Sequence, residues 1–200
     1  RLEISKKTDL WFSYGWDLYN NFSRERQSNS QIRRVRSDLN EYLTRGASGI
    51  DQLFLEHRGN LKDSIFFRSY IGILEMMYAG VGSELLYSPF GRRFGFGATF
   101  NWLKQRGFQK DFAFRDYQTL TGYLSFYYAA PFYNYDFAIH SGRYLGRDRG
   151  ATFEARRTFD NGFSIGGFFT KTDLSAEEFG EGSFDKGLFF RIPLNSLFRG

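Results

Sequence analysis

The residues best suited to nucleophilic chemistry lie in the pentapeptide GFSIG, residues 162–166. It matches the G-x-S-x-G pattern, in which a sharp strand-to-helix turn exposes a serine that a histidine activates. Here the pentapeptide follows the turn-forming FDNG and continues into residues that alternate as in a strand, so no helix is expected after it. Only His57 and His140 are available as a base. We therefore interpret Ser164 as an ordinary inward-facing residue and expect no enzyme, with an outer-membrane barrel enzyme acting on lipid or glycan kept as an alternative.

A group of arginines in a polar stretch is suited to binding polyanions. Arginine binds phosphate and carboxylate groups with two parallel hydrogen bonds. The group predicts a loop that contacts lipopolysaccharide phosphates or an acidic glycan, and a merely solvated loop explains it equally well. These residues are Arg24, Arg26, Arg33, Arg34 and Arg36.

Carboxylates gather between Thr172 and Lys186, and hard cations take oxygen ligands of this kind. Their spacing matches no EF-hand loop, and the absence of cysteine from the sequence excludes thiolate metal sites and disulfides. We expect a solvated loop, with plugging of the lumen or contact with a partner as the alternative, and no metal or cofactor. The acidic residues are Asp173, Glu177, Glu178, Glu181 and Asp185.

Alternation of apolar and polar residues recurs along the whole chain and predicts antiparallel strands with two different faces. The segment RRFGFGATFNW, residues 92–102, places aromatic residues on every second position and glycine or small polar residues between them. About ten such strands are expected, and no helix. The first is expected at 10–20, followed by a long extended segment over 40–58. Short, turn-rich connections alternate with mostly longer ones, which predicts that they emerge at opposite ends of the strands.

The amount of aromatic side chain decides which face meets the interior. Phe and Tyr on every strand would be hard to pack inside a small soluble barrel, whereas lipid accommodates any shape. We therefore predict an all-β fold: an antiparallel transmembrane β-barrel of the outer-membrane type, with about 10–12 strands. A soluble, lipocalin-like binding barrel is the alternative. Charged residues on the inner face are then expected to form a pairing network or to line a glycan path: Arg68, Glu84, Arg93, Glu154, Arg156 and Arg191.

Composition excludes several other classes of protein. The net charge is +5, but no block of five or six Lys and Arg residues occurs, so nucleic acid is not expected as a partner. No run of about 18 apolar residues predicts a membrane-spanning helix. The first residues, RLEISKKTDL, are charged and do not begin with Met, so they predict no signal peptide and suggest a mature or trimmed fragment.

Several stretches resemble one known family. They include LEMMYAGVGSELLYSPF (74–90), NWLKQRGF (101–108), FRDYQTLTGY (114–123), GRYLGRDRGATFEARRTFDNG (142–162) and TKTDLSAEEFGEGSFDKGLFFRIPL (170–194). They are similar to the C-terminal part of the YjbH family of outer-membrane exopolysaccharide-biosynthesis proteins. RRVRSDLNEY (33–42) also fits, and residues 1–30 fit more loosely.

This resemblance implies that residues 1–200 are a single β-barrel domain, the C-terminal fragment or a subunit of a larger protein. It implies a non-catalytic role in the export or surface assembly of exopolysaccharide or capsule, in the outer membrane of a Gram-negative bacterium. The partners implied are outer-membrane lipid and lipopolysaccharide, polysaccharide, and other export-machinery proteins or upstream domains.

Overall fold

The described part of the chain folds into one antiparallel sheet with one short helix. The structure, a computed structural model, describes residues 1–20, 38–175 and 184–193. The elements are β1 (Leu2–Ser5), β2 (Thr8–Gly15), α1 (Leu39–Arg45), β3 (Gly49–Lys62), β4 (Ile65–Ile73), β5 (Tyr78–Tyr87), β6 (Phe94–Arg106), β7 (Phe114–Ala129), β8 (Tyr135–Arg143), β9 (Arg149–Thr158), β10 (Ser164–Thr172) and β11 (Asp185–Arg191). Each strand pairs with the next one along the chain, so the order in the sheet is the order in the sequence. The predicted all-β, antiparallel fold is confirmed.

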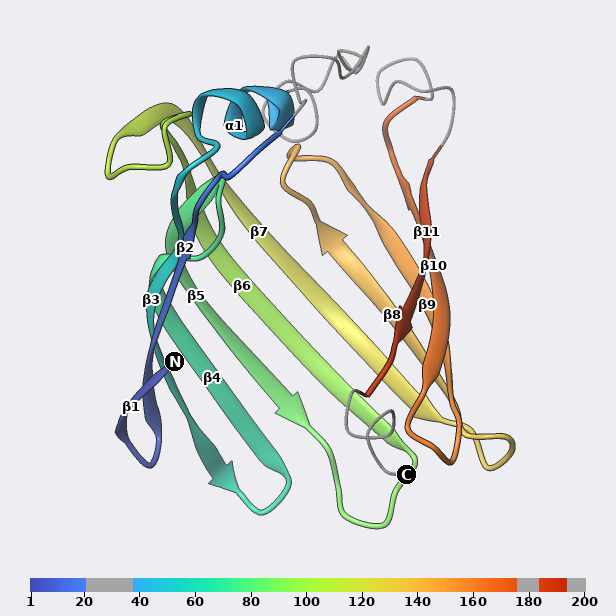
Figure 1. The fold of residues 1–200 in the computed structure, drawn as a ribbon. Coiled ribbons are helices and arrows are strands. Elements are labelled where there is room, and N and C mark those ends of the chain that lie inside the picture. The colour runs from blue at the N-terminus through green and yellow to red at the C-terminus, as the bar shows by residue number, and fades with distance from the viewer. Residues whose placement is uncertain (21–37, 176–183, 194–200) are drawn as a thin grey trace, which may run out of the picture.

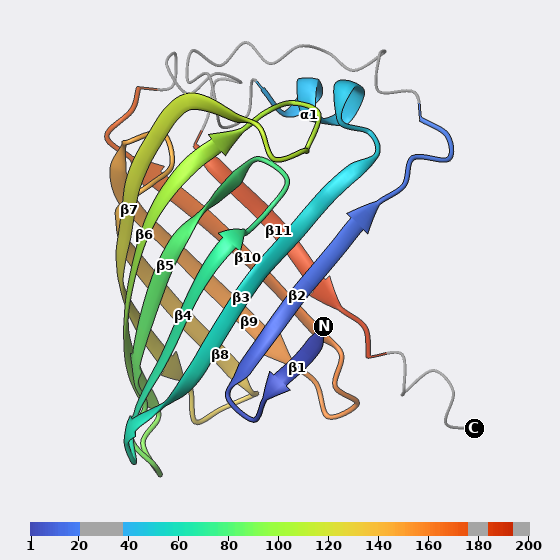
Figure 2. The same ribbon diagram turned by 90° about the vertical axis from the view of Figure 1, so that its left-hand side faces the viewer.

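The sheet curls around a central space. Figure 1 shows β1 to β5 on one side and β9 to β11 on the other, with β6 and β7 joining them behind. Figure 2, turned by 90°, shows the strands tilted across one another on the near and far walls. The helix α1 lies over the end of the sheet at which the β6–β7 connection also emerges.

The sheet does not close, which corrects the predicted barrel. Its eleven strands form an open order from β1 to β11, and the described residues contain no pairing between these two edges. The parity of the strands explains part of this. In a sheet where neighbours alternate in direction, the first and eleventh strands run the same way and cannot form an antiparallel ladder with each other. β1 also spans only Leu2–Ser5 and leaves the far end of β2 uncovered.

Most apolar side chains of the strands point away from the enclosed space, as the alternation predicts, with Phe54 and Leu103 among those that face it. On β6, Phe96, Phe100 and Trp102 are exposed, and on β7 they lie opposite Phe126, Gly122 and Leu120. The buried residues include many polar ones, with Asp9, Glu56, Asn101 and Thr121 among them. The sheet is therefore apolar outside and polar inside, the reverse of a soluble protein.

Two local predictions are wrong at the start of the chain. Residues 40–58 are not one extended segment, because α1 covers Leu39–Arg45 and β3 begins only at Gly49. A seven-residue helix has less than two full turns, so it is too short to show a periodic pattern in the sequence. Its stability depends on a tertiary contact. β1 was not expected, and β2 covers Thr8–Gly15 rather than 10–20.

The apolar cluster beneath α1 consists of Tyr42, Met77, Tyr78, Leu103 and Tyr117. Tyr42 is fully buried, and its hydroxyl donates to the carbonyl oxygen of Arg106. Burial raises the pKa of this hydroxyl, so it remains a neutral donor. The helix is thereby fixed to the last residue of β6.

The Arg106 side chain joins three segments of the chain at the same end of the sheet. It is 0% exposed and donates over 2.6–3.2 Å to the carbonyl oxygens of Ile50, Glu75, Met76, Lys110 and Asp111. These carbonyls belong to the start of β3 and to the β4–β5 and β6–β7 connections. Buried backbone carbonyls need such partners, so one guanidinium satisfies groups from three segments.

Of the helices in the described ranges, none is long and apolar enough to span a membrane.

Replacing Arg106 with Met, a side chain of comparable length without donors, is expected to leave several buried carbonyls unpaired. The free energy of unfolding should fall by about 3 kcal/mol. Urea titration of the purified protein in a mild detergent, followed by tryptophan fluorescence, measures this loss. The control is Arg149→Met at an exposed arginine, expected to change stability by less than about 0.5 kcal/mol. Equal losses in the two variants would contradict the role given to Arg106.

Candidate functional site in the interior of the sheet

The candidate site is the polar inner face of the curled sheet. Residues that lie directly opposite each other on neighbouring strands share a face, so the register carries one inner row across many strands. The first row runs from β2 to β7 through Asp9, Glu56, Tyr70, Gly82, Asn101 and Thr121. The next row runs from β3 to β7 through Arg58, Arg68, Glu84, Thr99 and Tyr123.

Arg68 is the centre of an ion-pair network within these rows. Its Nε lies 3.0 Å from Oε2 of Glu84 and its Nη2 lies 2.8 Å from Oε1, so the contact is bidentate. Its Nη1 also donates to Oε2 of Glu56 at 3.3 Å. Arg58 continues the network to Asp9, with 3.0 Å between Nη2 and Oδ2. Glu56 and Asp9 are almost completely buried, and burying a carboxylate is costly without partners of this kind.

A chain of neutral hydrogen bonds extends the network toward β7. The Tyr70 hydroxyl donates to Oδ1 of Asn101 at 2.6 Å, and the Asn101 amide lies 3.2 Å from Oγ1 of Thr121. The Tyr70 ring lies across Gly82, where a methyl group would overlap it. A glycine at this position therefore lets the ring lie this close to the wall.

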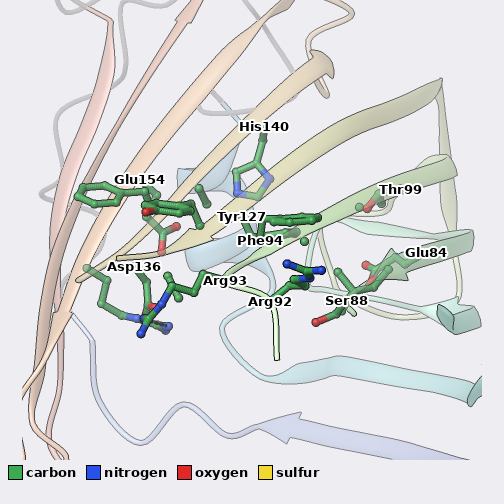
Figure 3. Close-up of a pocket in the computed structure, with 18 of the residues that line it drawn as sticks. Glu84, Ser88, Arg92, Arg93, Phe94, Thr99, Tyr127, Asp136, His140 and Glu154 are labelled. Atoms are coloured by element: carbon green, nitrogen blue, oxygen red, sulfur yellow. Dashed lines mark hydrogen bonds and ion pairs between the residues drawn. The ribbon is translucent and has the colours of Figure 1, made fainter. Parts of the chain in front are cut away.

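Two cavities are lined by described residues, and the larger of the two lies toward the end with the β5–β6 and β7–β8 connections. Its volume is about 490 Å³, and it is lined from β5 to β9. Asp136 and Arg156 form an ion pair of 2.8 Å in it, and Nδ1 of His140 lies 2.8 Å from Oγ of Ser125. Figure 3 shows Tyr127 and His140 in the middle, with Glu154 and Asp136 on one side and Glu84 on the other.

A second cavity of about 340 Å³ lies toward α1 and is lined by Glu56, Arg68, Tyr70, Asn101 and Tyr123, among others. Arg68 faces this smaller cavity and its partner Glu84 faces the larger one. The bidentate ion pair therefore lies on the wall between the two.

The structure brings most of the predicted inner charges to these two cavities. Arg68 lines the smaller one, whereas Glu84, Arg93, Glu154 and Arg156 line the larger one. Arg191 lines neither of them and lies opposite Ser164 in the β10–β11 pair. A shared lumen lined by all six residues stays a prediction.

Several important residues were missed in the sequence. Arg68 and Glu84 were both predicted to face inward, and they form an ion pair. The second partner of Arg68, Glu56, and the partner of Arg156, Asp136, were not predicted. The alternation around 136–145 is weak, so it did not assign a face to Asp136. Glu56 and Arg58 alternate with Leu55 and His57, and this was the signal that could have identified them.

The serine of GFSIG is the first residue of β10, so the segment after the turn is a strand and not a helix. Ser164 is buried and lies opposite Thr158 on β9. His140 lies at the level of Thr152 and Thr170, six residues further along β10, a separation of ~20 Å along the strand. His57 instead contacts Thr8 at 2.9 Å. Neither histidine is positioned to activate Ser164.

Two predicted loop sites fall largely outside the described residues. Arg24, Arg26, Arg33, Arg34 and Arg36 all lie in 21–37, and Glu177, Glu178 and Glu181 lie in 176–183. Asp173 accepts a hydrogen bond from the backbone amide of Arg149 at 2.9 Å. Within the described ranges, no cluster of three or more His, Asp or Glu side chains is arranged to hold a metal ion.

Comparison with known proteins identifies relatives. The family described as "Exopolysaccharide biosynthesis protein YbjH" matches residues 1–200. The "Uncharacterized lipoprotein YjbH" of Escherichia coli K12 is 33% identical over 219 residues, which cover 100% of this chain and 31% of that protein. The chain thus spans about a third of the length of this relative. No solved structure matches.

Replacing Arg68 with Lys should remove the bidentate contact with Glu84, because an ammonium group cannot reproduce the planar fork. Both side chains are partly exposed, so solvent screening limits the expected loss of stability to about 1 kcal/mol. The matched control is Arg156→Lys, where one nitrogen contacts Asp136 and a lysine retains most of the interaction. Urea unfolding of both variants measures the difference, and an equal effect would argue against the bidentate pair.

Proposed function

We propose that this chain forms part of a membrane-embedded β-barrel wall through which exopolysaccharide is exported or assembled at the cell surface. The premise is that the chain belongs to the YjbH family of exopolysaccharide biosynthesis proteins. The role is non-catalytic. The wall lies in the outer membrane of a Gram-negative bacterium, and its lipid and lipopolysaccharide surround the outer face.

The observation that carries the proposal is the exposed apolar outer face. Leu124 is 71% exposed, Phe100 57% and Phe12 58%, and all three lie on the side of the sheet away from the enclosed space. Contiguous apolar surface of this extent is rare on a water-soluble monomer. Hydrocarbon is the surrounding that matches it, and the strand alternation is that of outer-membrane barrels.

The inner face supports a path for a hydrophilic polymer. Its ion pairs, amides and hydroxyls present hydrogen-bonding groups to the enclosed space, whereas no histidine lies near Ser164 in the described residues. A polar interior with mutually paired charges can pass or hold a glycan without chemical change. The six inner charges named from the sequence then serve to line and stabilise this path.

When the sheet is embedded in a membrane, its open edges need a further segment of polypeptide to cover them. Unpaired backbone groups in hydrocarbon cost several kcal/mol each, so β1, the uncovered end of β2, and β11 cannot face lipid. We propose that further polypeptide covers them, either other parts of a longer protein or another component of the export machinery. That this chain corresponds to 31% of the E. coli relative supports such an additional segment.

The membrane proposal predicts opposite results for two arginine substitutions. Leu124→Arg on the outer face should cost about 2–4 kcal/mol in lipid, whereas Thr99→Arg on the inner face should cost little. Each variant is produced in cells of the source organism, and the outer-membrane fraction is run on a gel with and without boiling. The band of folded protein, which migrates differently in the unboiled sample, should be lost only for Leu124→Arg. If both variants fold equally, or if the protein is recovered outside the membrane fraction, the proposal is wrong.

A role in export is tested by deleting the gene and measuring polymer at the surface and within the envelope. Loss of surface polymer with accumulation inside is expected. Loss of both pools would point to synthesis instead. Ser164→Ala should restore surface polymer as well as the wild type, since no catalytic serine is required. A variant unable to complement, although folded in the membrane, would revive the barrel-enzyme alternative.

A further inference from the structure

We propose that the larger cavity is a binding subsite for a neutral glycan and that the ring of Tyr127 is the surface on which one sugar unit stacks. This inference rests on the proposed function, because it names the class of polymer that the inner face would meet.

The Tyr127 ring packs against the glycines of β6. A methyl group built on Gly97 would lie 3.2 Å from Cε2 of Tyr127, and one built on Gly95 would lie 3.8 Å from Cδ2. The first contact is tight and the second is ordinary van der Waals packing, so the missing side chain at Gly97 is the one that lets the ring lie this close to the wall. Tyr127 is nevertheless 38% exposed, and it lines the cavity. Part of the ring packs on the wall, and the exposed part faces the cavity, where a ligand can reach it.

Neighbouring residues fix the ring in this position. The rings of His140 and Tyr127 have centroids 5.6 Å apart and planes at 73°. His140 is itself held by the hydroxyl of the buried Ser125. Ala138, directly opposite Tyr127 on β8, contributes no bulk to the cavity. A rigid aromatic surface loses little conformational entropy on binding, which favours a stacking role.

The polar groups around the ring suit hydroxyl-rich ligands. Donors come from Arg92, Arg93 and Arg156, and acceptors come from Glu84, Asp136 and Glu154. Sugar hydroxyl groups both donate and accept hydrogen bonds, so they can use both kinds of partner, while the C–H groups of a pyranose face pack on an aromatic ring.

The balance of charge selects a neutral glycan over an acidic one. The lining contains three arginines and three carboxylates, whose formal charges cancel. Within this lining, Asp136 is moreover bound to Arg156, so these two charges neutralise each other locally. A site for phosphate or uronate would need an excess of cationic groups. The volume of about 490 Å³ lies within the range of ~300–1,000 Å³ common for ligand sites.

The smaller cavity repeats the arrangement. The Tyr70 ring lies across Gly82 and lines that cavity, beyond the Arg68–Glu84 pair. Two tyrosine surfaces on one inner wall fit a polymer whose repeating units contact the wall at more than one place.

The test measures binding of exopolysaccharide to the protein purified from membranes in detergent. The polymer is isolated from the organism that encodes the chain and separated by anion exchange into a neutral and an acidic fraction, and each is titrated by calorimetry. The neutral fraction should bind the wild type. Tyr127→Ala and Tyr127→Leu should weaken this binding about five- to tenfold, and Tyr127→Phe, which keeps the ring, should not.

The matched control is Phe126→Ala, the adjacent residue on the outer face, which should bind like the wild type. The boiling-dependent gel shift confirms that each variant is folded, and Tyr127→Leu retains bulk if the alanine variant does not fold. Unchanged binding in folded Tyr127 variants would overturn the role of the ring. Preference for the acidic fraction would overturn the neutral class, and binding of neither fraction would overturn the subsite. In that last case, loss of surface polymer on gene deletion would still support the export function by itself.

Discussion

The two-residue period of an antiparallel strand is the constraint on which this molecule depends. Each position lies on one face, and the register carries that assignment to the next strand across the ten pairings of the sheet. Four of the pairings contain a register shift, each near a strand end. Asp9 and Thr121 are far apart in the chain, yet they belong to one inner row because every strand between them keeps the register. A slip of one residue would bring the ion pairs to the apolar face and the phenylalanines into the polar interior.

Local patterns predicted most of the strands and their faces, because alternation can be seen within a few residues. Arg68 and Glu84 were assigned to the same face in this way, and a tight hairpin then brings them together. Features that depend on distant contacts were not predictable. Helix α1 is held by the contact of Tyr42 with Arg106, 64 residues away, and Asp136 lies in a strand whose alternation is weak. Closure was predicted wrongly, since the number of strands and the width of the gap are properties of the whole sheet.

The glycines of the inner wall have a different meaning from the one that strand propensity suggests. Gly82 and Gly97 would weaken an isolated strand, but each leaves room for a tyrosine ring from a neighbouring strand. The ring in turn covers the backbone that the glycine exposes. The tyrosine rings therefore narrow the enclosed space only slightly, and the two cavities remain between the polar rows.

The sequential strand order bears on how the sheet forms. Each of its pairings joins strands that are consecutive in the chain, and the longest connection, residues 16–48, separates β2 from β3. Closing a short loop carries a small entropic cost, so the ladder can grow by one hairpin at a time. No pairing has to wait for a contact between the two ends of the chain. Because both edges are unpaired among the residues that the structure describes, a strand can be added at either side without breaking a ladder hydrogen bond, and the circumference is set by the number of strands supplied.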